Sequence, residues 1–230
     1  TLNKKPESSI DLCILGQPNV GKSSLLNKLV GAERVIVSDI PHTTREPQDS
    51  FLTYKKEQIK IIDTAGLSKK SHRQAKSQRQ KVFAGKLKED NALEIYGIAK
   101  SLQVLKKADI VLFVFDVNQE IKVEDLKILE EAVQFRKSLI LLANKWDLTP
   151  ERDVKKFTEY IYAKVPFIPW APILFISAKN GKGTDKILDL VLEINEQRKI
   201  RLSDSQLQKF LSNVVKRHRP SRGKGFRQPR

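Results

Sequence analysis

The sequence predicts an α/β fold in which helices cover both faces of a doubly wound, six-stranded, mostly parallel sheet with one antiparallel strand. Short apolar runs alternate with amphipathic segments of helical period, which is the pattern of such a sheet. The runs Ile110–Phe115 and Ser138–Ala143 are almost continuously apolar, as in strands buried on both faces. The runs Asp49–Tyr54 and Gln58–Ile62 are joined so tightly that we expect them to be antiparallel.

The remaining elements follow in chain order. A strand over Ile10–Leu15 ends at Gly16, and a helix begins at Gly21. Residues 32–48 and the basic stretch 64–88 lack periodicity and are expected to be loops. The other expected elements are a strand over Ile173–Ile176 and helices over Ala92–Lys107, Val123–Phe135, Glu151–Ala163, Lys186–Arg201 and Ser203–Lys216, the last with Ser203 as its N-cap.

The composition excludes several classes of protein. The 230 residues suit one substantial domain with extra segments, and no apolar run is long enough to cross a membrane. The polar N-terminus offers no secretory leader, so a cytoplasmic location is expected. The one cysteine, Cys13, lies in the first apolar run and is expected to be a buried thiol.

The net charge of +16 is concentrated in two segments. Residues 68–88 hold eight Lys and Arg and no acid, and residues 198–230 hold eleven against one acid. Because neutralising phosphates releases counterions, patches of this kind commonly bind a polyanion. The alternative, a solvated basic face or a disordered tail, remains open for each segment.

Four motifs in a fixed order predict a guanine-nucleotide pocket. They are GQPNVGKS (Gly16–Ser23), DTAG (Asp63–Gly66), NKWD (Asn144–Asp147) and SAK (Ser177–Lys179). The first fits the P-loop pattern, in which a glycine-rich turn and a helix N-terminus aim N–H groups at phosphates. Each motif falls at or just after the end of an expected strand, where parallel sheets bind their ligands.

The phosphate half of this pocket follows from residue chemistry. Gly16 and Gly21 let the backbone turn closely around the β-phosphate, and Lys22 would reach the β- and γ-phosphates. Mg²⁺ is expected on Ser23 and Asp63, and on Thr44 rather than its neighbour Thr43. The residues expected to take part in catalysis are Lys22, Thr44, Gly66, whose N–H would face the γ-phosphate, and Asn19.

The base half of the pocket depends on the third and fourth motifs. Asp147, with Asn144, would select guanine, because one carboxylate can accept two hydrogen bonds from its N1–H and amino group. Lys145 would lay its stem over the base, Ala178 would offer a backbone N–H, and Trp146 is expected to pack beneath the loop. The full set expected at GTP or GDP is Gly16, Gln17, Pro18, Asn19, Val20, Gly21, Lys22, Ser23, Ser24, Asp63, Thr64, Ala65, Gly66, Leu67, Asn144, Lys145, Trp146, Asp147, Ser177, Ala178 and Lys179.

Through these motifs, and through VSDIPHTTRE and APILFISAKNGKG, the chain resembles the Era-like GTPases over roughly residues 8–215. It is most similar to the second GTP-binding domain of the Der (EngA) family of bacterial double GTPases. The resemblance implies a Ras-like P-loop core, GTP hydrolysis, and a role in maturing the large ribosomal subunit with contact to rRNA. It also implies a preceding GTPase domain and a following KH-like domain, so this chain is expected to be a fragment.

The resemblance sets the expected domain boundaries. Residues 1–9 would be a linker, residues 10–202 the Era-like GTPase domain, and residues 203–230 a helix and basic tail that resemble the start of the KH-like domain. Relative to the family pattern, about fifteen extra residues, roughly 71–85, interrupt the loop after DTAG, and this segment is strongly basic. We expect this insertion to contact rRNA in a nucleotide-dependent way, with disorder without contact as the alternative.

Two positions bear on the rate of hydrolysis. Leu67 stands where Ras-type enzymes carry a water-orienting glutamine, so intrinsic hydrolysis is expected to be slow. By resemblance, Asn19 would hold a K⁺ near the β- and γ-phosphates, although His42 replaces a family glycine in the loop that closes over the ion. Two alternatives remain: a nucleotide-sensing RNA-binding module with negligible hydrolysis in isolation, and a tRNA-modifying GTPase of the MnmE type.

Overall fold

A computed structural model describes residues 9–32, 35–37, 49–62 and 102–217. Contacts within the chain group it into two compact units, Thr1–Asn195 and Glu196–Arg230, each of which is described here by itself. Most of the expected helix over 92–107 and the basic stretch 64–88 lie outside the described residues. Among the residues that the structure does describe, no helix is both long and apolar enough to cross a membrane.

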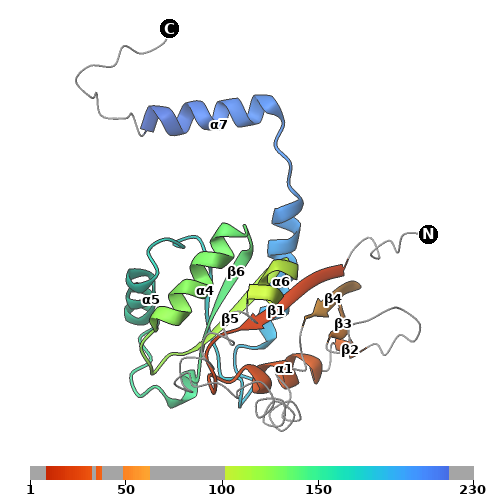
Figure 1. Ribbon diagram of the computed structural model, residues 1–230, viewed down its shortest axis with the longest axis vertical. Coiled ribbons are helices and arrows are strands. Elements are labelled where there is room, and N and C mark those ends of the chain that lie inside the picture. Colours follow the sequence, from red (N-terminus) through yellow and green to blue (C-terminus); the bar gives the residue numbers. More distant parts are fainter. Residues whose placement is uncertain (1–8, 33–34, 38–48, 63–101, 218–230) are drawn as a thin grey trace, which may run out of the picture. The chain divides into compact units, whose positions relative to one another are not determined.

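The first unit is built on one sheet of seven strands in the order β2-β3-β4-β1-β5-β6-β7 (Figure 1). All pairs are parallel except β2–β3 and β3–β4, so β3 is the one strand that runs against the others, as predicted. The strands are β1 (Ser9–Leu15), β2 (Val35–Val37), β3 (Ser50–Tyr54), β4 (Glu57–Ile61), β5 (Ile110–Asp116), β6 (Ser138–Asn144) and β7 (Ile173–Phe175).

The six predicted strands are therefore present, and β2 adds a seventh at the end of the sheet. It lies within the segment 32–48 that the sequence analysis expected to be a loop. Three residues are too few to show the alternating pattern of a strand. The segment is a strand because it pairs with β3, and its own sequence does not predict one. Between β3 and β4, Lys55 and Lys56 both have positive φ, 49° and 71°, which makes the tight hairpin turn.

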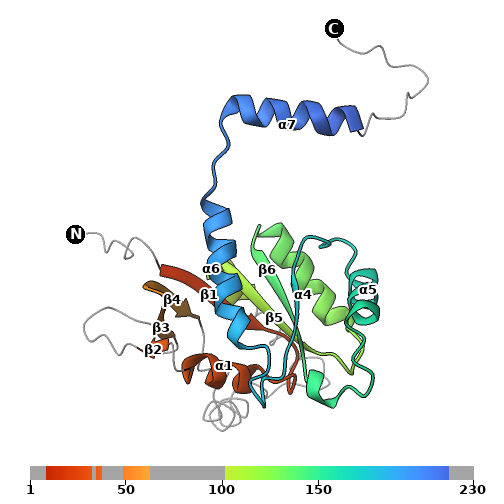
Figure 2. The ribbon, with the colours of Figure 1, turned by 180° about the vertical axis from the view of Figure 1, so that it is seen from behind.

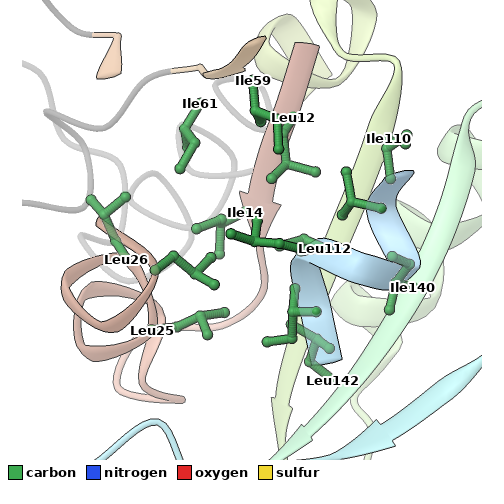
Figure 3. Packing of buried hydrophobic residues seen from close by; sticks show 14 of the residues in the cluster. Leu12, Ile14, Leu25, Leu26, Ile59, Ile61, Ile110, Leu112, Ile140 and Leu142 are labelled. Carbon is green, nitrogen blue, oxygen red and sulfur yellow. The ribbon is translucent and has the colours of Figure 1, made fainter. Parts of the chain in front are cut away.

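Helices cover both faces of the sheet, as the views from opposite sides in Figures 1 and 2 show. On one face α1 (Lys22–Val30) and α6 (Asp185–Lys199) bury their leucine and isoleucine side chains against β1, β4, β5 and β6. Figure 3 shows this packing, with Leu25 and Leu26 of α1 beside Ile14 of β1. On the other face lie α4 (Val123–Gln134), α5 (Val154–Lys164) and the helical residues 102–107.

The prediction that Cys13 is a buried thiol is confirmed. It is fully buried among the apolar side chains of the α4 face, and burial raises the pKa of its thiol. The α5 helix begins at Val154 rather than at Glu151, because Asp153 caps it: its carboxylate accepts a hydrogen bond from the Lys156 N–H at 3.0 Å.

The second unit contains the end of α6 and the helix α7 (Asp204–Arg217). As predicted, Ser203 caps α7: its hydroxyl accepts from the Gln206 N–H at 3.4 Å, and the Gln206 side chain accepts from the Ser203 N–H at 2.9 Å. Every residue of α7 is exposed, including its apolar side chains. Those side chains are Leu207, Phe210, Leu211, Val214 and Val215.

Candidate functional site

Three of the four sequence motifs meet at the carboxyl ends of the parallel strands. The P-loop follows β1, Asn144 is the last residue of β6, and Ser177 is the second residue after β7. In the register of the sheet, Asn144 pairs with Asp116 at the end of β5. Because these ends lie side by side, residues more than a hundred positions apart in the sequence form one site.

The P-loop backbone takes a conformation that demands small residues. Gly16 and Gly21 have φ of 140° and 105°, and Asn19 between them has φ of 65°. A Cβ at Gly16 would overlap the carbonyl oxygen of Val114, and one at Gly21 would overlap the side-chain amide of Asn144. The glycines therefore allow the loop to lie directly against β5 and β6.

The start of α1 is open toward the loop. Gly21 precedes the helix as its N-cap and has no side chain to cap it, and the N–H groups of a helix N-terminus suit an anion. Lys22, in the first turn, folds back over the loop, and its Nζ donates to the carbonyl oxygens of Gly16 at 2.8 Å and Gln17 at 2.6 Å. This places a positive charge beside an uncapped helix N-terminus, which suits a phosphate group.

The electrostatics of Lys22 favour a negatively charged ligand. Burial lowers the pKa of its ammonium to about 8, and the charge of Asp125 offsets part of that loss. A desolvated ammonium held by carbonyl dipoles gains more from an anion than an exposed lysine does. Pro18, Asn19 and Ser24 are exposed around it, while Val20 is buried and offers only its backbone.

Asn144 joins the three motifs through its buried side chain. Its Nδ2 donates to the Val20 carbonyl oxygen of the P-loop at 2.7 Å, and its Oδ1 accepts from the Ala178 N–H at 2.9 Å. Asn144 is 2% exposed, so both bonds are shielded from water. In this structure the Ala178 N–H that the sequence analysis offered to the base is engaged by Asn144, and a base oxygen would have to share or displace that bond.

A second network holds Lys145, the next residue. Lys145 has φ of 65°, and its Nζ forms an ion pair of 2.8 Å with the buried Asp116. Asn118 donates its backbone N–H to the same carboxylate at 3.0 Å, and its side-chain oxygen accepts from the Thr149 hydroxyl at 3.0 Å. The Asn118 side-chain amide also donates to the Lys145 carbonyl oxygen at 3.3 Å, so both the backbone and the ammonium end of Lys145 have a partner.

Trp146 packs beneath the loop, as predicted. Its ring contacts Phe157 at 5.2 Å in an edge-to-face arrangement and Phe175 at 4.6 Å. The 3₁₀ helix Trp146–Leu148 then leaves Asp147 partly exposed, with its backbone carbonyl accepting from Arg152 at 3.1 Å. The buried Trp146 indole thus fixes the backbone of the next residue, Asp147, whose side chain is partly exposed.

The SAK motif forms a tight turn after β7. Ser177 is buried, its hydroxyl accepts from the Asn180 N–H at 3.2 Å, and its N–H donates to the Lys182 carbonyl at 2.9 Å. Ala178 is buried under the turn and Lys179 is exposed on it. The DTAG motif lies outside the described residues: these are Asp63, Thr64, Ala65 and Gly66, together with Leu67, Thr43, Thr44 and the insertion 71–85.

Two site residues were missed by the sequence analysis: Asp116 and Asn118. Asp116 could have been found, because it is an acid at the carboxyl end of a buried strand, where the other motifs also lie. Asn118 carries no such signal, because only the fold brings its partners Lys145 and Thr149 near.

The described residues fit a magnesium–phosphate group as far as they extend. Ser23 offers a hard hydroxyl ligand in the first turn of α1, beside Lys22 and the loop whose glycines leave room for a phosphate. The other two expected ligands of the ion, Thr44 and Asp63, lie outside the described residues.

Two family models match the chain. The model described as 50S ribosome-binding GTPase matches residues 11–145, and that of the elongation factor Tu GTP binding domain matches residues 98–197.

Among curated relatives, GTPase Der of Chlorobium phaeobacteroides (strain BS1) is 35% identical over 224 residues, which are 96% of this chain and 48% of the relative. GTPase Der of Agathobacter rectalis is 38% identical over 94% of this chain and 46% of the relative. The chain spans about half the length of these relatives.

Solved structures show the same fold. Era in complex with MgGDPNP and a segment of 16S ribosomal RNA has a TM-score of 0.56 at 27% identity, over 81% of this chain and 56% of that one. The elongation factor SelB from Methanococcus maripaludis, bound to a GTP analogue, has a TM-score of 0.57 over 85% of this chain and 35% of that one. At 16% identity the second likeness concerns the fold alone.

Proposed function

This chain belongs to the family of 50S ribosome-binding GTPases, and on that premise we propose that it is a GTP-hydrolysing switch domain that acts in large ribosomal subunit assembly. The resemblance to Der read from the motifs is confirmed by relatives that carry the name GTPase Der. The match corresponds to a single GTP-binding domain, about half of each relative.

The observation that carries the proposal is the hydrogen bonding of Asn144. One buried amide joins the P-loop at Val20 to the SAK turn at Ala178, and it belongs to the first residue of the NKWD motif. Such a junction puts a phosphate-binding loop and a base-binding loop at a fixed separation, which a nucleotide requires and a lone phosphate does not. Two motifs that occurred by accident would have no reason to be joined in this way.

The proposed roles of the phosphate-side residues follow from their geometry. The N–H groups of the P-loop and of the start of α1 bind the β-phosphate, and Lys22 moves part of its hydrogen bonding from the loop carbonyls to the phosphates. Ser23, with Thr44 and Asp63, would hold Mg²⁺, and Gly66 would meet the γ-phosphate. When bound, that ion neutralises charge that develops on the phosphates.

On the base side, Asp147 accepts from guanine, Asn144 holds the loops together, and Lys145 supports the ring. An adenine base would leave the Asp147 carboxylate without its donors, so ATP should be rejected.

Hydrolysis is proposed to be slow and stimulated by K⁺. Leu67 cannot orient water by a hydrogen bond, so positive charge near the β- and γ-phosphates has to come from elsewhere. Asn19 supports the potassium role, since it is exposed in the P-loop with φ of 65° and its side chain is not buried in the fold.

The ribosomal role is proposed from three supports. The family is described as ribosome-binding, the relatives are named Der, and Era, 27% identical to this chain, was solved with ribosomal RNA. The two basic segments, including the insertion 71–85, would contact rRNA through phosphates. We place the protein in the cytoplasm, and in the intact protein we expect a GTPase domain before this one and a KH-like domain after it.

Leu67 also favours a second candidate function. A chain that binds GTP and GDP differently but hydrolyses GTP negligibly would be a nucleotide-sensing RNA-binding module. The two candidates share every residue of the site and differ only in turnover.

The test is nucleotide binding followed by single-turnover hydrolysis with the 230-residue chain. We expect GDP to bind and ADP to compete at least about a hundredfold more weakly, because the Asp147 pairing is lost. With Mg²⁺ present, GTP hydrolysis should rise in KCl relative to NaCl at equal ionic strength. Substituting Asn19→Ala should abolish the difference between the two salts.

Each outcome separates the proposals. Equal binding of GDP and ADP would contradict the guanine-nucleotide site itself. GDP binding without measurable hydrolysis in either salt would contradict the enzyme and favour the nucleotide-sensing module. Equal hydrolysis in both salts would contradict only the potassium site.

A further inference from the structure

The turn that follows β5 carries two polar residues that belong to none of the four motifs, Asp116 and Asn118. Asp116 is the last residue of β5 and is 6% exposed, and its carboxylate holds the Lys145 ammonium at 2.8 Å. Asn118 is exposed, and its backbone N–H donates to the same carboxylate at 3.0 Å. A buried carboxylate is costly unless it is paired, so its presence at this strand end calls for a reason.

The shape of the turn does not supply that reason. A neutral amide oxygen can accept the Asn118 N–H as a carboxylate oxygen does, because asparagine and aspartate form the same side-chain turns. Of the groups that the structure describes around Asp116, only the Lys145 ammonium requires a full negative charge. The charge of Asp116 therefore serves Lys145, the residue that is proposed to support the base.

Asn118 holds the backbone of the same lysine. Its Nδ2 donates to the Lys145 carbonyl oxygen at 3.3 Å, and its Oδ1 accepts from the hydroxyl of the buried Thr149 at 3.0 Å. The amide thus bridges the residue before and the residue after the 3₁₀ helix Trp146–Leu148. Lys145 has φ of 65°, a left-handed conformation that a residue with a side chain keeps only where its surroundings hold it.

We propose that Asp116 and Asn118 are positioning residues for the base half of the nucleotide site: Asp116 holds the ammonium of Lys145, Asn118 holds its backbone, and the stem between them is kept ready to support guanine. This inference rests on the proposed function, and it adds the end of β5 to the motifs that set nucleotide affinity. Neither residue needs to touch the ligand. A lysine that is already held loses less side-chain entropy when the nucleotide binds.

The experiment is a double-mutant cycle on GDP affinity, measured by titration of the 230-residue chain with a fluorescent GDP analogue. Asp116→Asn keeps the size of the side chain and an oxygen for the Asn118 N–H, so only the charge is removed. We expect it to weaken GDP binding about tenfold, as for the loss of one charge-assisted hydrogen bond. In the Lys145→Met background, which keeps an apolar stem without the ammonium, Asp116→Asn should weaken binding less than about twofold.

A second variant, Asn118→Ala, tests the contact with the backbone. Because Asn118 is exposed, we expect this variant to fold and to bind GDP about fivefold more weakly, as for the loss of a neutral hydrogen bond. Gln119→Ala is its matched control, since it shortens the neighbouring exposed amide side chain and should leave GDP affinity unchanged. Asp153→Asn is the control for Asp116→Asn: its carboxylate also accepts a backbone N–H, at 3.0 Å, but at the start of α5.

The outcomes decide between a positioning role and a merely structural one. An unchanged GDP affinity of Asp116→Asn, or the same loss in the parent and in the Lys145→Met background, would overturn the role of Asp116. If Asp116→Asn fails to fold, an unchanged affinity of Lys145→Met would do so, because the proposed route runs through that lysine. Equal affinities of Asn118→Ala and Gln119→Ala would overturn the role of Asn118. A parent that binds no GDP would refute the proposed function together with both roles, which distinguishes the two failures.

Discussion

At the scale of single residues, the site is held together by side chains that need not touch a ligand. Asn144 was expected from its motif to help select the base, and the structure gives it two buried bonds to protein atoms. Leaving a buried donor or acceptor without a partner costs more than the bond itself contributes. Asn144 is therefore expected to stabilise the folded site as well as to help bind the base.

Asn144→Asp tests how much these two hydrogen bonds stabilise the site, because it changes the shape of the side chain very little. The new carboxylate can still accept from the Ala178 N–H, but it sets an oxygen against the Val20 carbonyl oxygen where a donor had been. We expect the free energy of unfolding to fall by about 1–3 kcal/mol and GDP binding to weaken at least tenfold. Thermal or urea unfolding and a GDP titration measure the two effects.

Asn27→Asp is the control, because it makes the same chemical change at an exposed position of α1. It should alter stability by less than about 0.5 kcal/mol. If Asn144→Asp behaves like Asn27→Asp, the two buried bonds carry no weight and the junction of the loops must be explained otherwise.

At the scale of elements, the β3–β4 hairpin is tied to α6 by one carboxylate. Asp189 of α6 accepts from the Tyr54 hydroxyl at 2.7 Å and from the Lys55 ammonium at 2.6 Å. Tyr54 is 4% exposed, whereas the Lys55 and Asp189 side chains are 58% and 50% exposed. Exposed ion pairs contribute little, so the tyrosine should carry most of the stability of this contact.

We therefore expect Tyr54→Phe to lower the free energy of unfolding by about 1 kcal/mol and Lys55→Met to lower it by less than about 0.5 kcal/mol. Urea unfolding of both variants measures the difference. Raising the salt concentration should weaken only the lysine contribution. A larger loss from Lys55→Met than from Tyr54→Phe would reverse the assignment.

A helix or strand could be predicted where its own residues determine it, and could not be predicted where pairing with a distant segment determines it. The continuous apolar runs of β5 and β6 and the tight turn before β4 are local signals, and the strands formed where they indicated. Strand β2 could not be predicted, because its three residues owe their order to β3. The same holds within the site: motifs identified the P-loop and Asn144, but the ion pair of Asp116 with Lys145 becomes visible only when the strand register brings the two residues near.

At the scale of the whole molecule, the buried apolar side chains and the excess positive charge lie in different parts of the chain. The core of the first unit gathers apolar side chains on both faces of the sheet. The second unit is rich in Lys and Arg, and within it the residues of α7 are exposed. The Lys and Arg side chains of α7 are exposed, so their positive charge is available for polyanions.

Ending the chain after Leu202 separates these two contributions. The truncation removes α7 and eight Lys and Arg residues but leaves the sheet and every motif of the site in place. We expect the midpoint of thermal unfolding to shift by less than about 4 °C, which corresponds to about 1 kcal/mol in a domain of this size. GDP affinity should stay the same, while binding to a short RNA hairpin should weaken. Because each phosphate contact that is lost removes released counterions, the slope of log affinity against log salt should become shallower by roughly 0.7–0.9 per contact. An unchanged slope would mean that this segment makes no phosphate contacts and would leave the insertion at 71–85 as the remaining RNA-binding candidate.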